Sequence, residues 1–138
     1  MGPTRFTFTI HKSMVLNSNA MPHHMVKAKI VRFLRSYGFE VFAEPNGGEA
    51  YNEPVFDTFE IEAVICPPTR RRLDPPNLYP TVKALIDAGS VQKREGYIGC
   101  GLWDDDDWTH LSKLSFSYGG LSGIKDTFVI HFQVKPIG

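Results

Sequence analysis

The chain has 138 residues, an apolar content of 42% and 15 basic against 15 acidic side chains, so its net charge is zero. These values are typical of one globular domain over residues 1–138 and exclude a disordered chain. No apolar run approaches the roughly 20 residues of a membrane-spanning helix, and Cys66 and Cys100 lack the spacing of a zinc ribbon or a disulfide scaffold. We therefore expect an intracellular, cytoplasmic protein with no membrane partner.

The first half of the chain predicts a strand, a helix and a second, longer strand. Residues 5–11 alternate apolar and polar side chains, as a half-buried strand does. Residues 22–37 then show helical spacing, and Gly38 is expected to end that helix. Alternation returns over residues 55–66. The side chains expected to face inward from the two strands are Phe6, Phe8, Ile10, Phe59, Ile61, Ala63 and Ile65.

The second half predicts another helix and two further strands. Asn77 is expected to cap a helix over residues 78–88, and residues 90–101 form a glycine-rich loop. Residues 113–118 and 126–134 are expected to pair as a terminal hairpin, although the connection between them is too long for a two-residue turn. The predicted fold is therefore a mixed α/β (α+β) fold, a small mixed sheet with two packed helices in the order β-α-β-α-β-β.

Charge is segregated along the chain. Residues 1–39 contain bases and no acid, and residues 40–69 contain acids and no base. Two clusters follow, Arg70–Arg72 and Asp104–Asp107. This pattern is suggestive of a polyanionic partner. The outer face of the first helix has two interpretations, a solvated basic face or a phosphate-contacting face, and it carries Lys27, Lys29, Arg32 and Arg35.

The run Asp104–Asp107 repels itself, and this indicates a divalent-metal site. Magnesium needs only a few carboxylates, and in phosphodiester hydrolysis it activates water and neutralises phosphate charge. Asp74 lies between the second strand and the second helix, and Lys83 on that helix offers a cation for developing charge. Lys83 and Asp87, four residues apart, share one helix face. These residues predict a site that cuts nucleic acid, with Arg70–Arg72 holding its phosphates.

Other interpretations stay open for each of these groups. Asp74 is also typical of a turn that precedes prolines. The run Asp104–Asp107 also suits a solvated acidic loop, but it lacks the 12-residue spacing of an EF-hand. Glu60 and Glu62 alternate away from the core and are interpreted as solvated. His110 has no partner at ligand spacing and is assigned no role.

The central motifs resemble those of the RusA-type Holliday junction resolvases, which are endonucleases of phages and prophages. The shared motifs are three arginines before an aspartate, Asp-x-x-Asn-Leu from Asp74, Lys-Ala-x-x-Asp-Ala from Lys83, and an apolar-Trp pair before the aspartate run. The resemblance covers most of the chain, because the first strand with its Asn17-Ser18-Asn19 turn and the last two strands also match in order. It implies a prokaryotic or phage-encoded homodimer that nicks four-way DNA junctions symmetrically with Mg²⁺, for which Mn²⁺ would substitute.

The resemblance also implies roles for individual residues. Asp74 matches the first acid of the family, Lys83 matches its catalytic lysine, and the late acid falls within residues 105–107. The implied catalytic set is Asp74, Lys83, Asp106 and Asp107, and the implied metal ligands are Asp74, Asp105, Asp106 and Asp107. Together with the charge pattern, the motifs indicate a DNA-binding set of Arg70, Arg71, Arg72, Asn77, Lys27, Arg32 and Arg35.

Three departures from the family pattern bear on activity. Pro76 stands where the family has its second acid, residues 79–81 are inserted before Lys83, and the loop of residues 90–101 is long. The missing acid is replaced by another aspartate of the run or by Asp87, or it is not replaced. We expect a crossover junction endodeoxyribonuclease of DNA recombination and repair. The alternatives are an inactive junction-DNA-binding protein of the same fold and a metal nuclease acting on other branched DNA.

Overall fold

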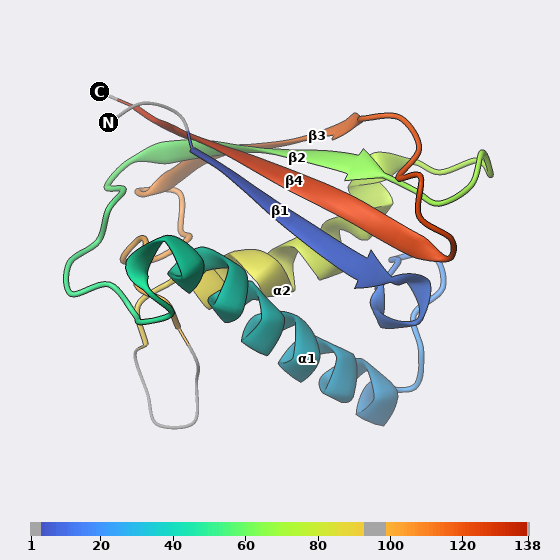
Figure 1. The fold of residues 1–138 in the computed structure, drawn as a ribbon, viewed down its shortest axis with the longest axis horizontal. Coiled ribbons are helices and arrows are strands. Elements are labelled where there is room, and N and C mark those ends of the chain that lie inside the picture. Colours follow the sequence, from blue (N-terminus) through green and yellow to red (C-terminus); the bar gives the residue numbers. More distant parts are fainter. Residues whose placement is uncertain (1–3, 93–98, 138) are drawn as a thin grey trace.

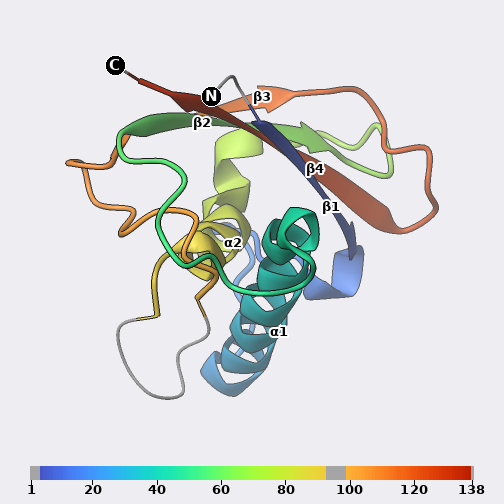
Figure 2. The same cartoon turned by 60° about the vertical axis from the view of Figure 1, so that its left-hand side comes forward.

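The computed structural model describes residues 4–92 and 99–137, which form a four-stranded sheet with two helices against one of its faces (Figures 1 and 2). None of the helices in this part of the chain is long and apolar enough to cross a membrane. The mixed sheet with two packed helices confirms the predicted fold class. In chain order the elements are β1 (Thr4–His11), α1 (His24–Ala43), β2 (Phe59–Cys66), α2 (Tyr79–Gly89), β3 (Leu111–Tyr118) and β4 (Thr127–Pro136).

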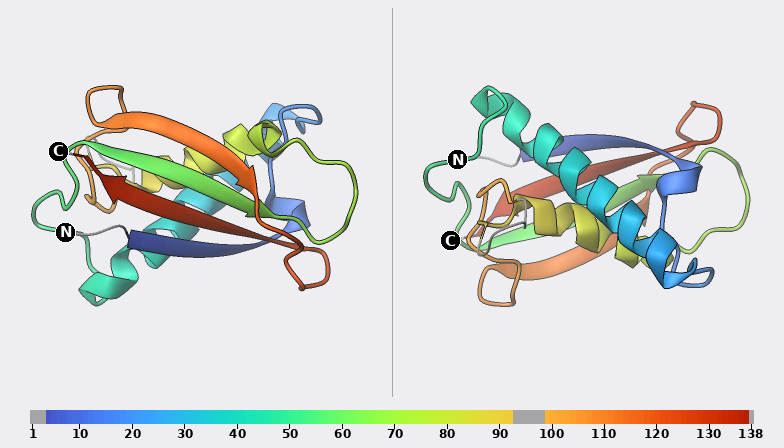
Figure 3. Two further views of the ribbon diagram at one scale, coloured as in Figure 1. Left: turned by 90° about the horizontal axis from the view of Figure 1, so that it is seen from above. Right: turned by 90° about the horizontal axis from the view of Figure 1, so that it is seen from below.

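The strands lie in the order β1-β4-β2-β3, so the predicted terminal hairpin is wrong. β4 runs antiparallel to both β1 and β2, whereas β3 is parallel to β2 at the edge (Figure 3). Because β2 and β3 are parallel, the two strands end on the same side of the sheet. There the chain passes the end of β2 and returns as β4. Gly119 marks this crossing: its N–H donates to the Ile65 carbonyl (2.9 Å), and a Cβ on it would collide with Val64.

The composition of the last two strands explains which of them lies inside the sheet. Ile130, Phe132 and Val134 of β4 are fully buried, and β4 is paired on both sides. β3 is the edge strand and exposes Lys113, which suits an edge that must not recruit further strands. The alternation over residues 113–118 predicts that Tyr118 faces the core, but this side chain is 59% exposed.

Gly38 does not end α1, which continues to Ala43, so that prediction is wrong. Gly38 lies where α1 crosses α2, and a Cβ on it would come 2.8 Å from the Ala88 Cβ and 3.4 Å from the Leu85 carbonyl oxygen. A glycine is therefore required for close contact between the helices, and the tertiary packing offsets its poor helix propensity.

Two other boundaries differ from the predicted ones. The second strand begins at Phe59 rather than at Val55, because the backbone at Val55 and Phe56 turns aside and donates two hydrogen bonds to the Leu102 carbonyl. Asn77 lies within a 3-10 turn, Pro75–Leu78, and α2 begins without a side-chain cap. Of the predicted loop at residues 90–101, residues 93–98 lie outside the described residues.

Trp103 anchors the start of the aspartate run in the core. Its ring is fully buried, stacks on Phe59 (centroids 4.7 Å apart, 27° between planes) and meets Phe42 edge-on at 5.4 Å. The backbone N–H of Trp103 donates to the Gly89 carbonyl (3.3 Å), and the backbone carbonyl of Trp103 accepts from the Val91 N–H (3.0 Å). The ring lies so close to Gly89 that no Cβ fits there. Asp104–Asp107 therefore leave the core from a fixed point beside the C-terminal end of α2.

Candidate active site around Lys83

Lys83 is the centre of an ion-pair network that joins three segments of the chain. From α2 its ammonium group donates to Asp87 Oδ1, one turn later, and to Asp106 Oδ2, 23 residues later, with both N–O distances 2.5 Å. The other carboxylate oxygen of Asp87 lies 3.4 Å from a guanidinium nitrogen of Arg35 on α1. The predicted shared face of Lys83 and Asp87 is thus confirmed. Arg35, one of the residues predicted to contact DNA, pairs with Asp87.

The network sets the charge states of its members. Burial lowers the pKa of Lys83, but the hydrogen bonds from its ammonium to Asp106 and Asp87 outweigh burial and raise the pKa above the ordinary value. Burial raises the pKa of Asp106, Lys83 opposes this rise, and the charge of Asp87 adds to it, so that the net shift is upward. Lys83 is therefore a permanent cation at neutral pH, and Asp106 is a carboxyl group whose ionisation depends on that cation.

The four aspartates of the run point to different partners. Asp106 reaches Lys83, and its own N–H donates to Asp105 Oδ1 (2.8 Å). Asp107 accepts from the N–H and the hydroxyl of Thr109 (3.1 and 2.5 Å), so its side chain organises a local turn. Of the predicted catalytic residues, the structure brings Lys83 and Asp106 into contact.

Asp74 lies elsewhere. It is exposed immediately before the 3-10 turn Pro75–Leu78, and its side chain makes no capping hydrogen bond. In Figure 1 the segment around residues 70–78 precedes the N-terminal end of α2, whereas the aspartate run follows from the opposite end of that helix. Among residues 4–92 and 99–137, no three His, Cys, Asp or Glu side chains are grouped closely enough to hold a metal ion. The predicted grouping of Asp74 with the run is therefore not assembled in this structure.

Two carboxylates do come together at Lys83, those of Asp87 and Asp106. Carboxylate oxygens are the ligands that Mg²⁺ prefers, and Mg²⁺ retains several waters, so a site with few protein ligands fits that ion. The side chains of Asp87 and Asp106 are 13% and 18% exposed, so both carboxylates are largely enclosed and are held at the Lys83 ammonium. The metal site remains a prediction, and Asp87 and Asp106 are the two residues that would hold it.

An open cleft of about 420 Å³ between α1 and α2 leads to this network. Its lining includes Lys27 and Arg35 from α1 and Tyr79, Lys83 and Asp87 from α2. Tyr79 is 47% exposed at its mouth. The cleft therefore places cationic side chains and an aromatic ring beside Asp87, an arrangement that can attract a phosphate group.

The other predicted DNA-binding residues do not line the cleft. Arg70–Arg72 are exposed on the segment that follows β2, and Arg32 is exposed on α1. Asn77 is half-buried, and its backbone carbonyl accepts from the Ser18 N–H (2.9 Å). The arginine cluster is therefore free to meet a polyanion, but at a different part of the surface from Lys83.

His110 is a neighbour of the aspartate run to which the sequence assigned no role. Its Nδ1 lies 2.9 Å from the Asp57 carbonyl oxygen, which makes Nδ1 the donor, and its Nε2 lies 3.8 Å from Asp104 Oδ2. The hydrogen bond to the Asp57 backbone raises the pKa of His110, and the charges of Asp107, Asp104 and Asp57 add to the rise. No local pattern predicts the contact between His110 and Asp57, because the two residues are far apart in the chain.

His110 should make stability depend on pH. A histidine whose pKa is raised on folding stabilises the fold fully below its unfolded pKa, roughly 6.5, and this stabilisation is lost as the pH rises through the folded pKa. The difference in unfolding free energy between the wild type and His110→Gln should therefore be larger below about pH 6 than above about pH 8. Urea denaturation at both pH values measures it. In an NMR titration His110 should have a higher midpoint than His131, whose pKa burial lowers; the reverse order would contradict the assignment.

No protein-family model and no curated protein matches the chain. The site is thus described by its own residues. The motifs indicated Lys83 and Asp106, which meet, and the helical spacing indicated the partnership of Lys83 with Asp87. The pairing of Arg35 with Asp87 had no signal in the sequence, because it depends on where α1 crosses α2.

Proposed function

We propose that the protein is a Mg²⁺-dependent, structure-selective DNA endonuclease that resolves four-way junctions by paired nicks during DNA recombination and repair. The observation that carries the proposal is the contact between Lys83 and Asp106, which joins two catalytic candidates that are 23 residues apart in the chain. The resemblance of the Asp74 and Lys83 motifs to the RusA-type resolvases supports it, as does the basic cleft that leads to Lys83.

The residues of the site divide the work of phosphodiester hydrolysis. Asp106 and Asp87 would hold Mg²⁺, which when bound supplies a more acidic water and neutralises phosphate charge. Lys83 remains protonated and balances the negative charge that develops on the scissile phosphate. Lys27 lines the cleft and attracts the DNA backbone without reading its sequence. Paired symmetric nicks require two such sites about a two-fold axis, hence a homodimer.

A second candidate is a junction-binding protein without nuclease activity. Two observations favour it: Pro76 occupies the position of an acid in the resolvase motif, and within the described residues no group of three potential metal ligands is formed. Such a protein would bind junctions with the same steep salt dependence but give no product. A third candidate, a nuclease of flaps or single strands, would show no preference for junctions.

Four synthetic DNA substrates separate these candidates. They are a four-way junction, a flap, a duplex and a single strand, each incubated with Mg²⁺, Mn²⁺ or EDTA. The wild type should give paired nicks in the junction with either metal, and Asp106→Asn should lose about 100-fold or more in rate. Asp104→Asn is the matched control, because it removes a charge from the same run on the side of His110 rather than Lys83. Retained binding without nicks would identify the inactive binder, and equal losses in both variants would reject the assignment of Asp106.

A further inference from the structure

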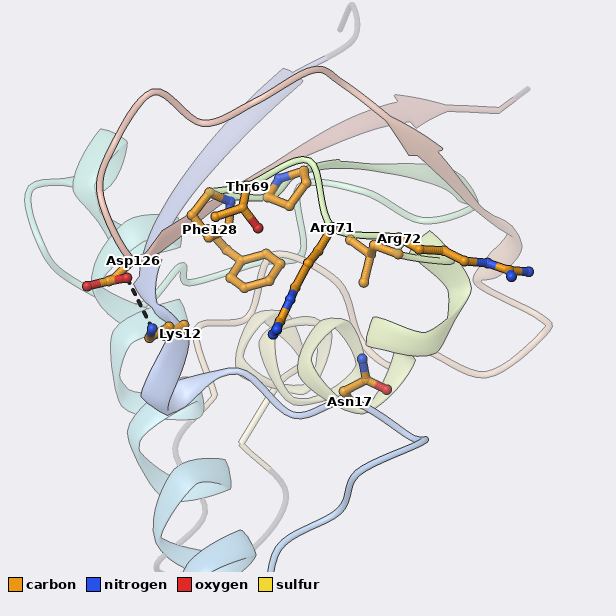
Figure 4. A pocket seen from close by; sticks show the side chains of 10 residues that line it. Lys12, Asn17, Thr69, Arg71, Arg72, Asp126 and Phe128 are labelled. Atoms are coloured by element: carbon orange, nitrogen blue, oxygen red, sulfur yellow. Dashed lines mark ion pairs between the residues drawn. The ribbon is translucent and has the colours of Figure 1, made fainter.

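A cavity of about 530 Å³ lies apart from the Lys83 cleft, where the chain leaves β2 (Figure 4). Residues 67–69 and 71–73 form one wall, Lys12 from the 3-10 turn after β1 and Asn17 form another, and Asp126 and Phe128 at the start of β4 complete it. Nothing in the proposed nuclease chemistry uses this cavity. It is large enough to hold a small ligand.

The charges around the cavity favour an anion. Among the described residues that line it, Lys12, Arg71 and Arg72 are cationic, and Asp126 is the carboxylate. Asp126 Oδ1 lies 3.1 Å from Lys12 Nζ and orients this lysine, while both arginines are exposed. In Figure 4 the Arg71 side chain extends into the cavity, whereas Arg72 points away from Phe128. A guanidinium group with free donors recognises phosphate oxygens in a fixed geometry.

The remaining wall is apolar and flat. Phe128, which is half-buried, presents its ring to the cavity, and Pro67, Pro68 and Leu73 line the same space. An aromatic ring beside cationic side chains is the arrangement that binds a nucleotide through its base and its phosphate together. A free phosphate would leave the apolar wall unused.

The walls are held by backbone hydrogen bonds, so the cavity is formed before a ligand arrives. The Lys12 N–H donates to the Asp126 carbonyl (2.7 Å), and the Ser122 N–H donates to the Pro67 carbonyl (2.8 Å). Asn17 is fixed because its side-chain oxygen accepts from the Asn19 N–H (2.8 Å). Preformed walls reduce the ordering cost of binding.

We propose that this cavity binds one nucleotide of DNA whose base is unpaired, with the phosphate at Arg71 and Lys12 and the base against Phe128. The base must be unpaired because in a duplex both of its faces are stacked, and the ring of Phe128 has no access to them. The proposal rests on the proposed function only in taking DNA as the natural ligand, since binding at the cavity requires neither metal nor cleavage.

Fluorescence anisotropy with a labelled single-stranded oligothymidylate in EDTA tests the proposal. Arg71→Ala should weaken binding about tenfold, as expected for a lost charge-assisted contact. Arg5→Ala is the matched control: it removes the same charge from an exposed residue of β1 that does not line the cavity, and it should change affinity by no more than about twofold. Phe128→Leu should also weaken binding about tenfold through lost stacking, without affecting binding of a duplex of equal length.

Asp126→Asn gives a change of opposite sign. It removes the negative charge from the wall and should tighten binding several-fold, and asparagine accepts the positive φ of 55° at this position. Thermal melts of all four variants check that each is folded. Equal losses in Arg5→Ala and Arg71→Ala, or a matching loss of duplex binding in Phe128→Leu, would overturn the proposal.

The two proposals fail in different ways. If the wild type never nicks a junction but its single-strand binding depends on Arg71 and Phe128, the nuclease proposal fails and the cavity assignment stands. If junctions are nicked and single-strand binding ignores both residues, the cavity assignment fails alone. Mononucleotide competition separates the sources of the ligand: thymidine monophosphate should displace the oligonucleotide, and inorganic phosphate at the same concentration should not.

Discussion

Lys83→Met is expected to reduce the rate of junction cleavage by about 100- to 1,000-fold, the size of effect seen when one preorganised charge-stabilising donor is removed. The side chain is shortened by little, but Asp87 and Asp106 lose the ammonium group that both contact. Because Lys83 opposes the upward shift of the Asp106 pKa, its removal should raise that pKa further. Any residual cleavage should therefore require a higher pH than in the wild type, which a pH–rate profile with Mg²⁺ measures.

Lys113→Met provides the control for Lys83→Met. Lys113 is exposed on the edge strand β3, so its replacement removes one positive charge without touching the network. It should cleave junctions within about twofold of the wild-type rate, since isolated surface charges contribute little. Similar losses in the two variants would show that net charge, not the position of Lys83, is responsible. Full activity in Lys83→Met would remove this lysine from the chemistry altogether.

Gly89→Ala is expected to lower the free energy of unfolding by about 3 kcal/mol, the upper part of the usual range for overpacking a core. Helix propensity alone would favour alanine by about 1 kcal/mol, so a loss of stability is specific to the packing. The added methyl group would occupy the space of the buried Trp103 ring, which the rings of Phe42, Phe56 and Phe59 hold in place. Urea denaturation measures the change.

A second substitution distinguishes a clash from any other effect of Gly89→Ala. In the Trp103→Phe background the smaller ring leaves room for the methyl group, so the cost of Gly89→Ala should fall by about 1 kcal/mol or more, a measurable coupling between residues in contact. A cost that is the same in both backgrounds would exclude the clash. Gly89→Ala should also slow junction cleavage, because Trp103 fixes the point from which Asp104–Asp107 leave the core.

Local patterns predicted the parts of this fold that depend on neighbours in sequence. The alternation in β1 and β2 gave their buried faces correctly, since period-two burial is a property of a single strand. Gly38 was misread because a glycine is equally suited to ending a helix and to letting two helices touch, and only the partner helix decides between them. The hairpin of the last two strands failed for a similar reason: sequence proximity favours pairing, but burial of β4 decides its place.

In the candidate site, too, local patterns predict some contacts, and the others depend on how the chain folds. The pair Lys83 and Asp87 follows from helical spacing, and Asp106 was indicated by its motif. Which aspartate of a run of four reaches a lysine depends on the exact exit of the chain from Trp103, which no local rule supplies. Asp74 was expected near them because it shares their motif, yet α2 separates its segment from the run.

The position of β4 between β1 and β2 has a consequence for how the protein is synthesised. β1 is synthesised before its partner in the described sheet, β4, and residues 12–126 lie between the two strands. The phenylalanines of β1 must therefore remain without their sheet partner until residues 127–136 have been synthesised, and contacts this distant in sequence form slowly. A ribosome stalled before residue 127 should hold a nascent chain that is sensitive to protease and bound by chaperones, and release should permit a single late folding step.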